Sequence, residues 1–129
     1  MLRVLIVDDE DKSSAMILLM LKKYFPCISC VRIASSVKEA VKTLQQQPID
    51  LVFLDIILKG ESGFDLLDKI PDRSWQFITL SASKEFAFKT FEYGGAGYLL
   101  KPVNKKELTA ALSNLIKLNP LISHQPPLI

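Results

Sequence analysis

The chain has 129 residues, 49% of them hydrophobic and 23% charged, and its formal net charge at pH 7 is +2. This length suits one domain with a single core, and the small net charge, without any run of basic residues, argues against a nucleic-acid or membrane-surface protein. The longest apolar stretch, residues 15–21, is too short to span a bilayer. Acidic residues directly follow the N-terminal apolar segment and no small-residue cleavage site is present, so we expect a cytoplasmic protein without a secretory signal.

The N-terminal part of the chain has the pattern of a strand, a helix and a second strand. Residues 3–7 are a predicted buried strand, which four acidic residues, 8–11, bring to an end. A helix is predicted over residues 12–25 from its length and its flanking lysines, and Pro26 stops it. Residues 28–34 form the second predicted strand. This order is typical of a unit in which a helix connects two strands of one sheet.

The two cysteines, Cys27 and Cys30, have the Cys-x-x-Cys spacing. A redox pair of this kind normally lies at a helix N-terminus, where the dipole lowers the pKa of a thiol, but here the pair leads into a strand. A zinc site would need two further ligands, and the only histidine, His124, lies in the C-terminal segment. We therefore expect ordinary cysteines, buried or half-buried.

The middle of the chain holds a capped helix and the most apolar strand. Ser36 and Glu39 have the spacing of a capping box, in which a hydroxyl and a carboxylate satisfy the free amides at a helix start. The helix that follows has one apolar face, formed by Val37, Ala40, Val41 and Leu44. Residues 51–55 then run from four large apolar residues straight into Asp55, which is typical of a parallel strand buried on both faces.

The rest of the chain continues the alternation of strands and helices. Residues 56–62 are a predicted loop. A helix, a strand and a helix are predicted at residues 64–70, 75–81 and 84–93. The last strand is predicted at residues 98–101, and a last helix with an Asn104 cap follows it. We expect residues 1–118 to form the domain, and residues 119–129, which contain three prolines, to form a tail or the start of a linker.

Five strands that alternate with five helices predict an α/β fold with a doubly wound parallel sheet, helices on both faces and right-handed crossovers. Large aromatic residues fall in the second half of the chain, at Trp75, Phe86, Phe88 and Phe91. We assign them to packing, with part of the phenylalanine cluster as an alternative partner surface.

Polar residues lie at the predicted carboxyl ends of several strands. They are Asp8, Asp9, Asp55, Ser81 and Lys101. The carboxyl ends of parallel strands form the crevice in which ligands bind. Three close carboxylates repel one another and raise each other's pKa unless a cation shares the site, and hard oxygen ligands suit Mg²⁺. With Mg²⁺ and the lysine, an incoming phosphoryl group would be neutralised from two sides, and Asp55 could act as a carboxylate nucleophile that forms an aspartyl phosphate.

The order and spacing of these residues resemble the receiver domain of bacterial two-component response regulators over residues 2–118. The matching pieces are Val7-Asp8-Asp9, Leu54-Asp55 with Gly63 eight residues on, Ser81-Ala82 and Tyr98-Leu99-Leu100-Lys101-Pro102. Residues 77–107 are most similar to receivers of the LytTR class. Receivers of that class usually precede a β-rich DNA-binding domain, which we expect to be the output domain beyond this chain.

The resemblance implies a flavodoxin-like fold with strand order 2-1-3-4-5 and a phosphoacceptor role for Asp55. It implies that Asp9 binds Mg²⁺ directly together with Asp55, that Asp8 holds the ion largely through water, and that the backbone carbonyl of Ile57 is a further ligand.

The resemblance also assigns the residues that respond to the phosphoryl group. Ser81 would hydrogen-bond a phosphoryl oxygen, and Lys101 would form an ion pair with the group. Tyr98 would change rotamer when Ser81 moves inward, and the bond between Lys101 and Pro102 would be cis.

The function that follows is a signalling switch rather than an enzyme with a separate substrate, because the chain would catalyse only its own phosphorylation and dephosphorylation. A sensor histidine kinase would donate the phosphoryl group from its phosphohistidine. The new charge would bias the face built from the fourth helix, the fifth strand and the fifth helix. That face would contact a second copy of the chain in a homodimer or an output domain, and nucleic acid would be bound only through that domain.

Two positions depart from the usual receiver pattern. Lys59 stands where most receivers have proline after the phosphorylated strand, which implies a more mobile loop or an extra positive charge near the site. Ile57 is apolar where some receivers have a polar side chain that handles the attacking water. Because Ser83 lies on the other side of the site, we expect water to be aligned poorly and the phosphoryl-aspartate to be long-lived.

Three other classes of protein share part of this pattern. Mg²⁺-dependent phosphatases and phosphotransferases generally need a second acid two residues after the nucleophile, where this chain has Ile57, and a cap for which it has no room. A flavin or nucleotide binder would need a Gly- or Ser/Thr-rich phosphate loop after the first strand. The remaining alternative is a degenerate receiver that acts as a phosphorylation-independent protein-interaction module, although the chemical groups of an active receiver are all present.

Overall fold

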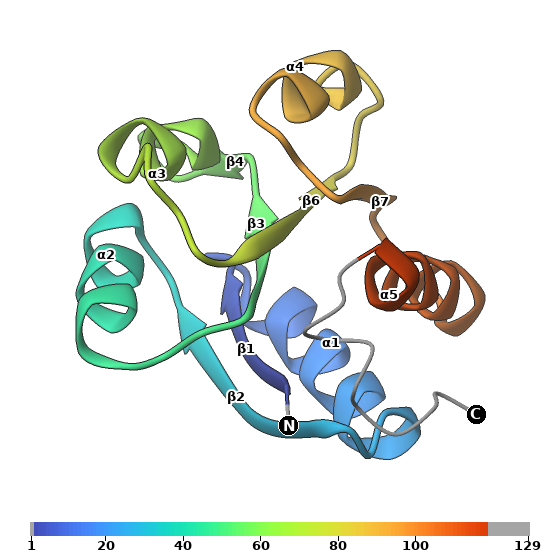
Figure 1. Cartoon of the computed structure of the whole chain (residues 1–129). Coiled ribbons are helices and arrows are strands. Elements are labelled where there is room, and N and C mark those ends of the chain that lie inside the picture. The colour runs from blue at the N-terminus through green and yellow to red at the C-terminus, as the bar shows by residue number, and fades with distance from the viewer. Residues whose placement is uncertain (1, 119–129) are drawn as a thin grey trace.

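A computed structural model describes residues 2–118, and the predicted tail, residues 119–129, lies outside the described part. The central sheet has five parallel strands (Figure 1). They are β1 (Leu2–Val7), β2 (Ile28–Ala34), β3 (Leu51–Asp55), β6 (Gln76–Ser81) and β7 (Gly97–Leu100). Their order is β2-β1-β3-β6-β7. Since β6 and β7 are the fourth and fifth strands of this sheet, the predicted order is confirmed.

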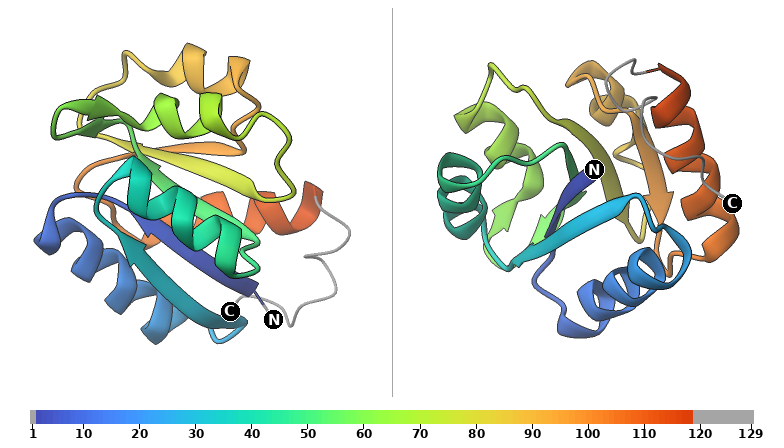
Figure 2. Two further views of the ribbon diagram at one scale, coloured as in Figure 1. Left: turned by 90° about the vertical axis from the view of Figure 1, so that its left-hand side faces the viewer. Right: turned by 60° about the horizontal axis from the view of Figure 1, so that its bottom comes forward.

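Helices cover both faces of the sheet, as Figures 1 and 2 show from three directions. They are α1 (Asp11–Tyr24), α2 (Val37–Gln46), α3 (Gly63–Lys69), α4 (Ala87–Glu92) and α5 (Lys105–Leu118). Helices α1 and α5 pack on one face, and α2 and α3 pack on the other beside α4. This is the doubly wound arrangement that the alternating pattern predicted.

The alternation of side chains along each strand divides the core into two apolar clusters. In β1, Val4 and Ile6 face α1 and α5, whereas Leu5 and Val7 face α2 and α3. All five residues of β3 are buried, because helices cover both of its faces. The continuous apolar run that marked this strand in the sequence is therefore explained by its central place in the sheet.

A short hairpin occupies the segment after β3 that was predicted to be a loop. Strands β4 (Ile57–Leu58) and β5 (Glu61–Ser62) pair antiparallel. Gly60 lies in the turn with a φ of 70°, a conformation that glycine adopts without strain. The prediction was wrong because two-residue strands are too short to show a period of two in the sequence.

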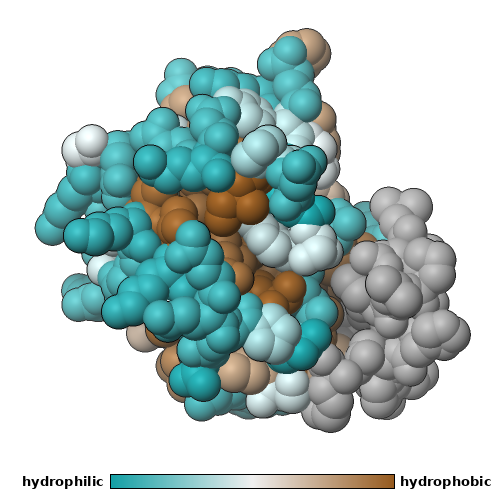
Figure 3. All heavy atoms as spheres, turned by 60° about the vertical axis from the view of Figure 1, so that its left-hand side comes forward, coloured by the Kyte–Doolittle hydropathy of each residue, from teal (hydrophilic) through white to brown (hydrophobic). Residues whose placement is uncertain are grey.

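The hairpin is linked to α2 by a side chain that sequence patterns did not identify. The Glu61 carboxylate accepts a hydrogen bond of 2.9 Å from the backbone N–H of Val37 in the first turn of α2. A groove of about 400 Å³ lies beside this contact, lined by Val37, Lys38, Val41, Glu61 and Lys69. On this side of the molecule, Figure 3 shows apolar side chains in a hollow ringed by hydrophilic ones.

Two predicted caps form, one of them in a modified way. Ser36 accepts a hydrogen bond from the backbone N–H of Glu39, but the Glu39 carboxylate binds the N–H and hydroxyl of Ser35 rather than the N–H of Ser36. Asn104 accepts a hydrogen bond from the backbone N–H of Glu107 at the start of α5. The cap signals therefore located both helix starts correctly.

Helix α4 is shorter than the predicted helix over residues 84–93, because the segment before it forms turns. The Ser83 hydroxyl accepts a hydrogen bond from the backbone N–H of Glu85. Within α4 only Thr90 is buried, and its hydroxyl donates to the hydroxyl of Thr79 in β6 over 3.0 Å. A pair of hydroxyl groups therefore connects α4 to the centre of the sheet.

The aromatic residues do not all pack as predicted. Trp75 is buried and Phe86 packs against the core, but Phe88 and Phe91 are 78% and 57% exposed. The packing assignment is wrong for these two side chains, because both lie on the side of α4 that faces away from the sheet. Cys27 is buried and Cys30 is half-buried, and both are free, as predicted. Burial raises the pKa of the Cys27 thiol, which makes it less reactive.

Within residues 2–118, no helix combines the length and the apolar character that crossing a bilayer requires.

Candidate functional site

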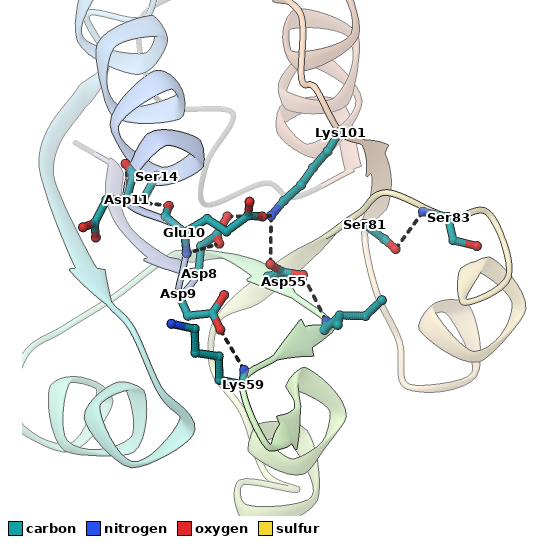
Figure 4. A network of polar contacts seen from close by, with 11 residues as sticks. Asp8, Asp9, Glu10, Asp11, Ser14, Asp55, Lys59, Ser81, Ser83 and Lys101 are labelled. Carbon is teal, nitrogen blue, oxygen red and sulfur yellow. Dashed lines mark hydrogen bonds and ion pairs between the residues drawn. The ribbon is translucent and has the colours of Figure 1, made fainter.

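The strand ends bring the predicted polar residues to one edge of the sheet (Figure 4). Asp55 is the last residue of β3, Asp8 directly follows β1, and Lys101 directly follows β7. Because Val7 pairs with Leu54 and Ser81 pairs with Leu100, these strands end at nearly the same level. Parallel pairing in this register therefore places residues far apart in the sequence beside one another.

Lys101 lies at the centre of the charged groups. Its amine is 2.8 Å from Asp55 Oδ2, 2.9 Å from Asp8 Oδ2 and 2.9 Å from Glu10 Oε1. Burial opposes the charged form of this lysine, but its contacts with the three carboxylates outweigh that effect and raise its pKa. Lys101 is therefore a permanent cation at neutral pH.

The three aspartates form a cluster of oxygen ligands. One carboxylate oxygen from each of Asp8, Asp9 and Asp55 lies within 4.8 Å of the other two. Asp8 Oδ2 is fully buried and accepts no hydrogen bond of ordinary geometry, although the Lys101 amine is close to it. One lysine cation beside several carboxylates compensates their charge only in part. The oxygens of the three aspartates fit a hard divalent ion such as Mg²⁺.

Backbone N–H groups of the β4–β5 hairpin hold two of these carboxylates. Asp55 Oδ1 accepts a hydrogen bond of 3.0 Å from Ile57, and Asp9 Oδ2 accepts one of 2.7 Å from Lys59. Ile57 thus reaches the site through its backbone, and its side chain is 57% exposed. The hairpin therefore orients both the candidate phosphoacceptor and a candidate metal ligand.

Burial controls the protonation of Asp55. The desolvated carboxyl group has its pKa raised to about 6, an effect that the adjacent Lys101 opposes and the charge of Asp8 reinforces. The upward direction agrees with the expectation for close carboxylates, but its main cause is burial rather than their mutual repulsion. The group is still mainly ionised at pH 7, so it can act as a nucleophile.

The raised pKa of Asp55 predicts a pH-dependent stability. Between about pH 4 and pH 6 the folded protein binds the proton of Asp55 more strongly than the unfolded chain does, so the free energy of unfolding falls as the pH rises through this window. The loss is on the order of 2–3 kcal/mol by pH 7. Denaturant titrations give the free energies of unfolding of the wild type and of Asp55→Asn at pH 4 and pH 7. The wild type should lose stability relative to the variant between the two pH values. The prediction would be contradicted if the difference between the two free energies of unfolding were the same at both pH values, or if the wild type gained stability relative to the variant at pH 7.

Ser81 and Tyr98 lie at the side of the site formed by the loop between β6 and α4. Ser81 is buried, and its hydroxyl accepts a hydrogen bond of 3.1 Å from the backbone N–H of Ser83. The Tyr98 hydroxyl donates to the backbone carbonyl of Ser83. Both side chains therefore contact the same loop residue. The bond between Lys101 and Pro102 is cis, as the resemblance implied.

Sequence reasoning missed Glu10 as a residue of the site. It was counted only as one of the four acids that end the first predicted strand, but its side chain turns back to Lys101. The sequence carries no signal for this contact, because it depends on the direction of the Glu10 side chain at the N-cap of α1. Asp11, one residue later, points away from the lysine.

The order of strands and the acidic cluster with its lysine define a class of protein. A family model for the response regulator receiver domain matches residues 4–113. The chain therefore belongs to the receiver-domain family of two-component response regulators.

Curated relatives refine this assignment. The chain is 33% identical to the sensory transduction protein LytT of Enterococcus faecalis over 118 residues, which cover 90% of this chain and 48% of LytT. It is 36% identical to the sensory transduction protein LytR of Staphylococcus epidermidis over 118 residues, which cover 88% of this chain and 46% of LytR. The chain spans about half the length of the curated relatives it matches. The predicted similarity to receivers of the LytT and LytR type is confirmed.

Solved structures share the fold. A two-component response regulator from Clostridium difficile has a TM-score of 0.80 and 25% identity, with coverage of 92% of this chain and 99% of that one. The response regulator TrrA from Thermotoga maritima, solved in complex with Mg²⁺-BeF, has a TM-score of 0.77 and 26% identity, with coverage of 89% and 99%.

Proposed function

We propose that Asp55 accepts a phosphoryl group and that the chain acts as a phosphorylation-dependent switch. The observation that carries this proposal is the buried Asp55 carboxylate, 2.8 Å from the Lys101 amine and clustered with oxygens of Asp8 and Asp9. A buried nucleophile beside a fixed cation and a set of carboxylate oxygens that suits Mg²⁺ is the arrangement that phosphoryl transfer needs.

In the proposed reaction, one carboxylate oxygen of Asp55 attacks the phosphorus of the donor. A bond between this oxygen and phosphorus forms while the bond to the leaving group breaks, and the leaving group keeps the electron pair. Lys101 and the Ser81 hydroxyl bind oxygens of the transferred group. Asp9, Asp55, the Ile57 carbonyl and, through water, Asp8 would hold Mg²⁺, which would supply positive charge for the phosphoryl oxygens.

The proposed donor is a sensor histidine kinase, because the family acts in two-component systems and its members receive phosphoryl groups from such kinases. The complex of TrrA with Mg²⁺-BeF supports Mg²⁺ as the cofactor. The chain is in this view a phosphoacceptor that catalyses only its own phosphorylation and dephosphorylation, rather than an enzyme with a separate substrate. A degenerate receiver is not favoured, because the aspartates, the lysine and the serine meet at one site.

The proposed output is a change in the face formed by α4, β7 and α5. Ser81 would move toward the phosphoryl group, and Tyr98, whose hydroxyl binds the same loop, would change rotamer with it. We propose that residues 1–118 are the receiver of a longer cytoplasmic regulator of the LytT and LytR type. The changed face would bind a second receiver or an output domain, and the output domain would contact DNA and control transcription.

The test of the proposed function is direct phosphorylation of the wild-type chain. We expect incubation with Mg²⁺ and acetyl phosphate to add one phosphoryl group, detected by intact mass, and peptide mapping to place it on Asp55. The addition should stop when the ion is removed with EDTA. A chain that stays unmodified with Mg²⁺, or that is modified equally well in EDTA, would refute the proposal.

A further prediction concerns the lifetime of the phosphorylated form. Ile57 offers no polar side chain to a water molecule, and the hydroxyl of Ser83 already accepts a hydrogen bond from Glu85. Water should therefore be aligned poorly and the phosphoryl-aspartate should persist. We expect Ile57→Asn to shorten its half-life by about tenfold, because positioned acid–base and hydrogen-bonding groups contribute factors of that order or more. Decay of the phosphorylated mass after the donor is removed measures this, with Ile57→Leu as the control. A wild-type half-life of seconds would contradict the prediction.

A further inference from the structure

Lys101 has more carboxylate neighbours than the predicted site supplies. An ammonium group carries three N–H donors, and oxygens of Asp8, Asp55 and Glu10 already surround this one at 2.8–2.9 Å. The amine donates hydrogen bonds to Glu10 and Asp55 and forms an ion pair with Asp8. The negative charge of these three carboxylates opposes the approach of a phosphoryl oxygen to the amine, and withdrawal of one of them relieves that repulsion.

The three carboxylates differ greatly in what withdrawal would cost. The side chains of Asp8 and Asp55 are 0% and 5% exposed, whereas that of Glu10 is 67% exposed. Moving a buried carboxylate away from its cation leaves an uncompensated charge in the interior. The Glu10 carboxylate can replace its contact with the lysine by hydrogen bonds to water at little cost in free energy, since exposed ion pairs are weak.

The backbone around Glu10 favours such an exchange. Its N–H donates a hydrogen bond of 2.9 Å to Asp8 Oδ1, and the residue is the N-cap of α1. The backbone is therefore fixed to the site while the side chain has several rotatable bonds. The carboxylate can swing out into solvent without moving Asp8 or the helix.

We propose that Glu10 is a positioning residue that holds the Lys101 amine beside Asp55 before phosphorylation and yields its place to the phosphoryl group. This inference rests on the proposed function of Asp55. Glu10 competes with the phosphoryl group for one donor of the lysine, so it lowers the affinity of the site for phosphoryl-like anions.

The test compares the full chain with the Glu10→Gln variant at saturating Mg²⁺. We expect Glu10→Gln to bind beryllofluoride roughly two- to fivefold more tightly, and to accept a phosphoryl group from sub-saturating acetyl phosphate faster by a similar factor, which matches the weight of an exposed ion pair. Unchanged or weaker binding would overturn the inference.

Two variants separate the ion pair from the effect of charge alone. Asp11→Asn removes the same charge one residue later, from a carboxylate directed away from Lys101 (Figure 4), and should behave as the wild type. Glu10→Asp keeps the charge but shortens the side chain, and should behave as Glu10→Gln. Tighter binding in Asp11→Asn, or wild-type behaviour of Glu10→Asp, would overturn the inference.

A spectroscopic readout distinguishes failure of the inference from failure of the proposed function. In the metal-free protein, the nitrogen resonance of the Lys101 ammonium should shift in Glu10→Gln and not in Asp11→Asn. An unshifted resonance in Glu10→Gln overturns the ion pair even if Asp55 is phosphorylated. A wild-type chain that binds no beryllofluoride and accepts no phosphoryl group overturns the proposed function. The proposed replacement of Glu10 by a phosphoryl group at Lys101 is then overturned too, even if the resonance shifts.

Discussion

Replacing Asp55 with asparagine is expected to abolish phosphorylation of the chain by acetyl phosphate. Asparagine has nearly the same shape, but its amide oxygen is a far weaker nucleophile than a carboxylate. The variant also loses one of the three carboxylates of the candidate Mg²⁺ site and one ion-pair partner of Lys101. Intact mass after incubation with Mg²⁺ and acetyl phosphate should show the added group on the wild type and none on the variant.

The fold should survive this substitution, so the loss can be attributed to chemistry. Asp55 is buried with its pKa raised, so at pH 7 its charge costs stability that asparagine restores. Asp72→Asn, at an exposed loop position, is the matched control and should be phosphorylated as the wild type. A phosphoryl group that still appears on Asp55→Asn would remove Asp55 from its proposed role.

Replacing Gly63 with alanine should damage both stability and phosphorylation. A Cβ at this position would lie 2.2 Å from the backbone carbonyl oxygen of Asp55 and 3.1 Å from the Cα of Ile56. Both are backbone atoms, so no side-chain rotation can relieve the contact. We expect a loss of about 1–3 kcal/mol in the free energy of unfolding. Because the displaced atoms carry the nucleophile, the phosphorylation rate should fall by about a hundredfold.

Gly97→Ala supplies the control for the added methyl group. Its Cβ would meet side-chain atoms of Ile78 at 3.6 Å, an ordinary contact. This substitution in β7 should leave stability within about 1 kcal/mol of the wild type and leave the phosphorylation rate unchanged. Chemical denaturation and the rate of mass increase measure both effects. Equal behaviour of the two alanine variants would show that the contact between Gly63 and Asp55 has no consequence.

The central strands were predictable because they are short, mainly apolar runs with a polar residue at or directly after the end. Residues 51–55 show this most clearly, and the buried β3 has those bounds. Their shared edge followed from parallel pairing, which also brought Lys101 to Asp55. The hairpin after β3 was not predictable, because its strands of two residues leave no periodic signal.

Side-chain direction is the part of the site that the sequence does not encode in a readable pattern. Glu10 could have pointed to solvent, as Asp11 does, and nothing in the run of acids separates the two. The capping of α2 by Glu61 likewise joins residues 24 positions apart in different elements. Such contacts depend on how the loops are folded over the sheet edge, so they become visible only in three dimensions.

The attachment of α4 has a consequence for how the molecule can change shape. Between Ala87 and Glu92 only Thr90 is buried, and it meets the sheet through a hydroxyl group rather than through an apolar side chain. Tilting this helix would break this directional contact and would also shift Phe86 and Tyr93 at its two ends, which pack against one apolar cluster. The energetic barrier to reorienting α4 therefore has two parts: a polar contact at the middle of the helix, which water can satisfy during the movement, and aromatic packing at its ends.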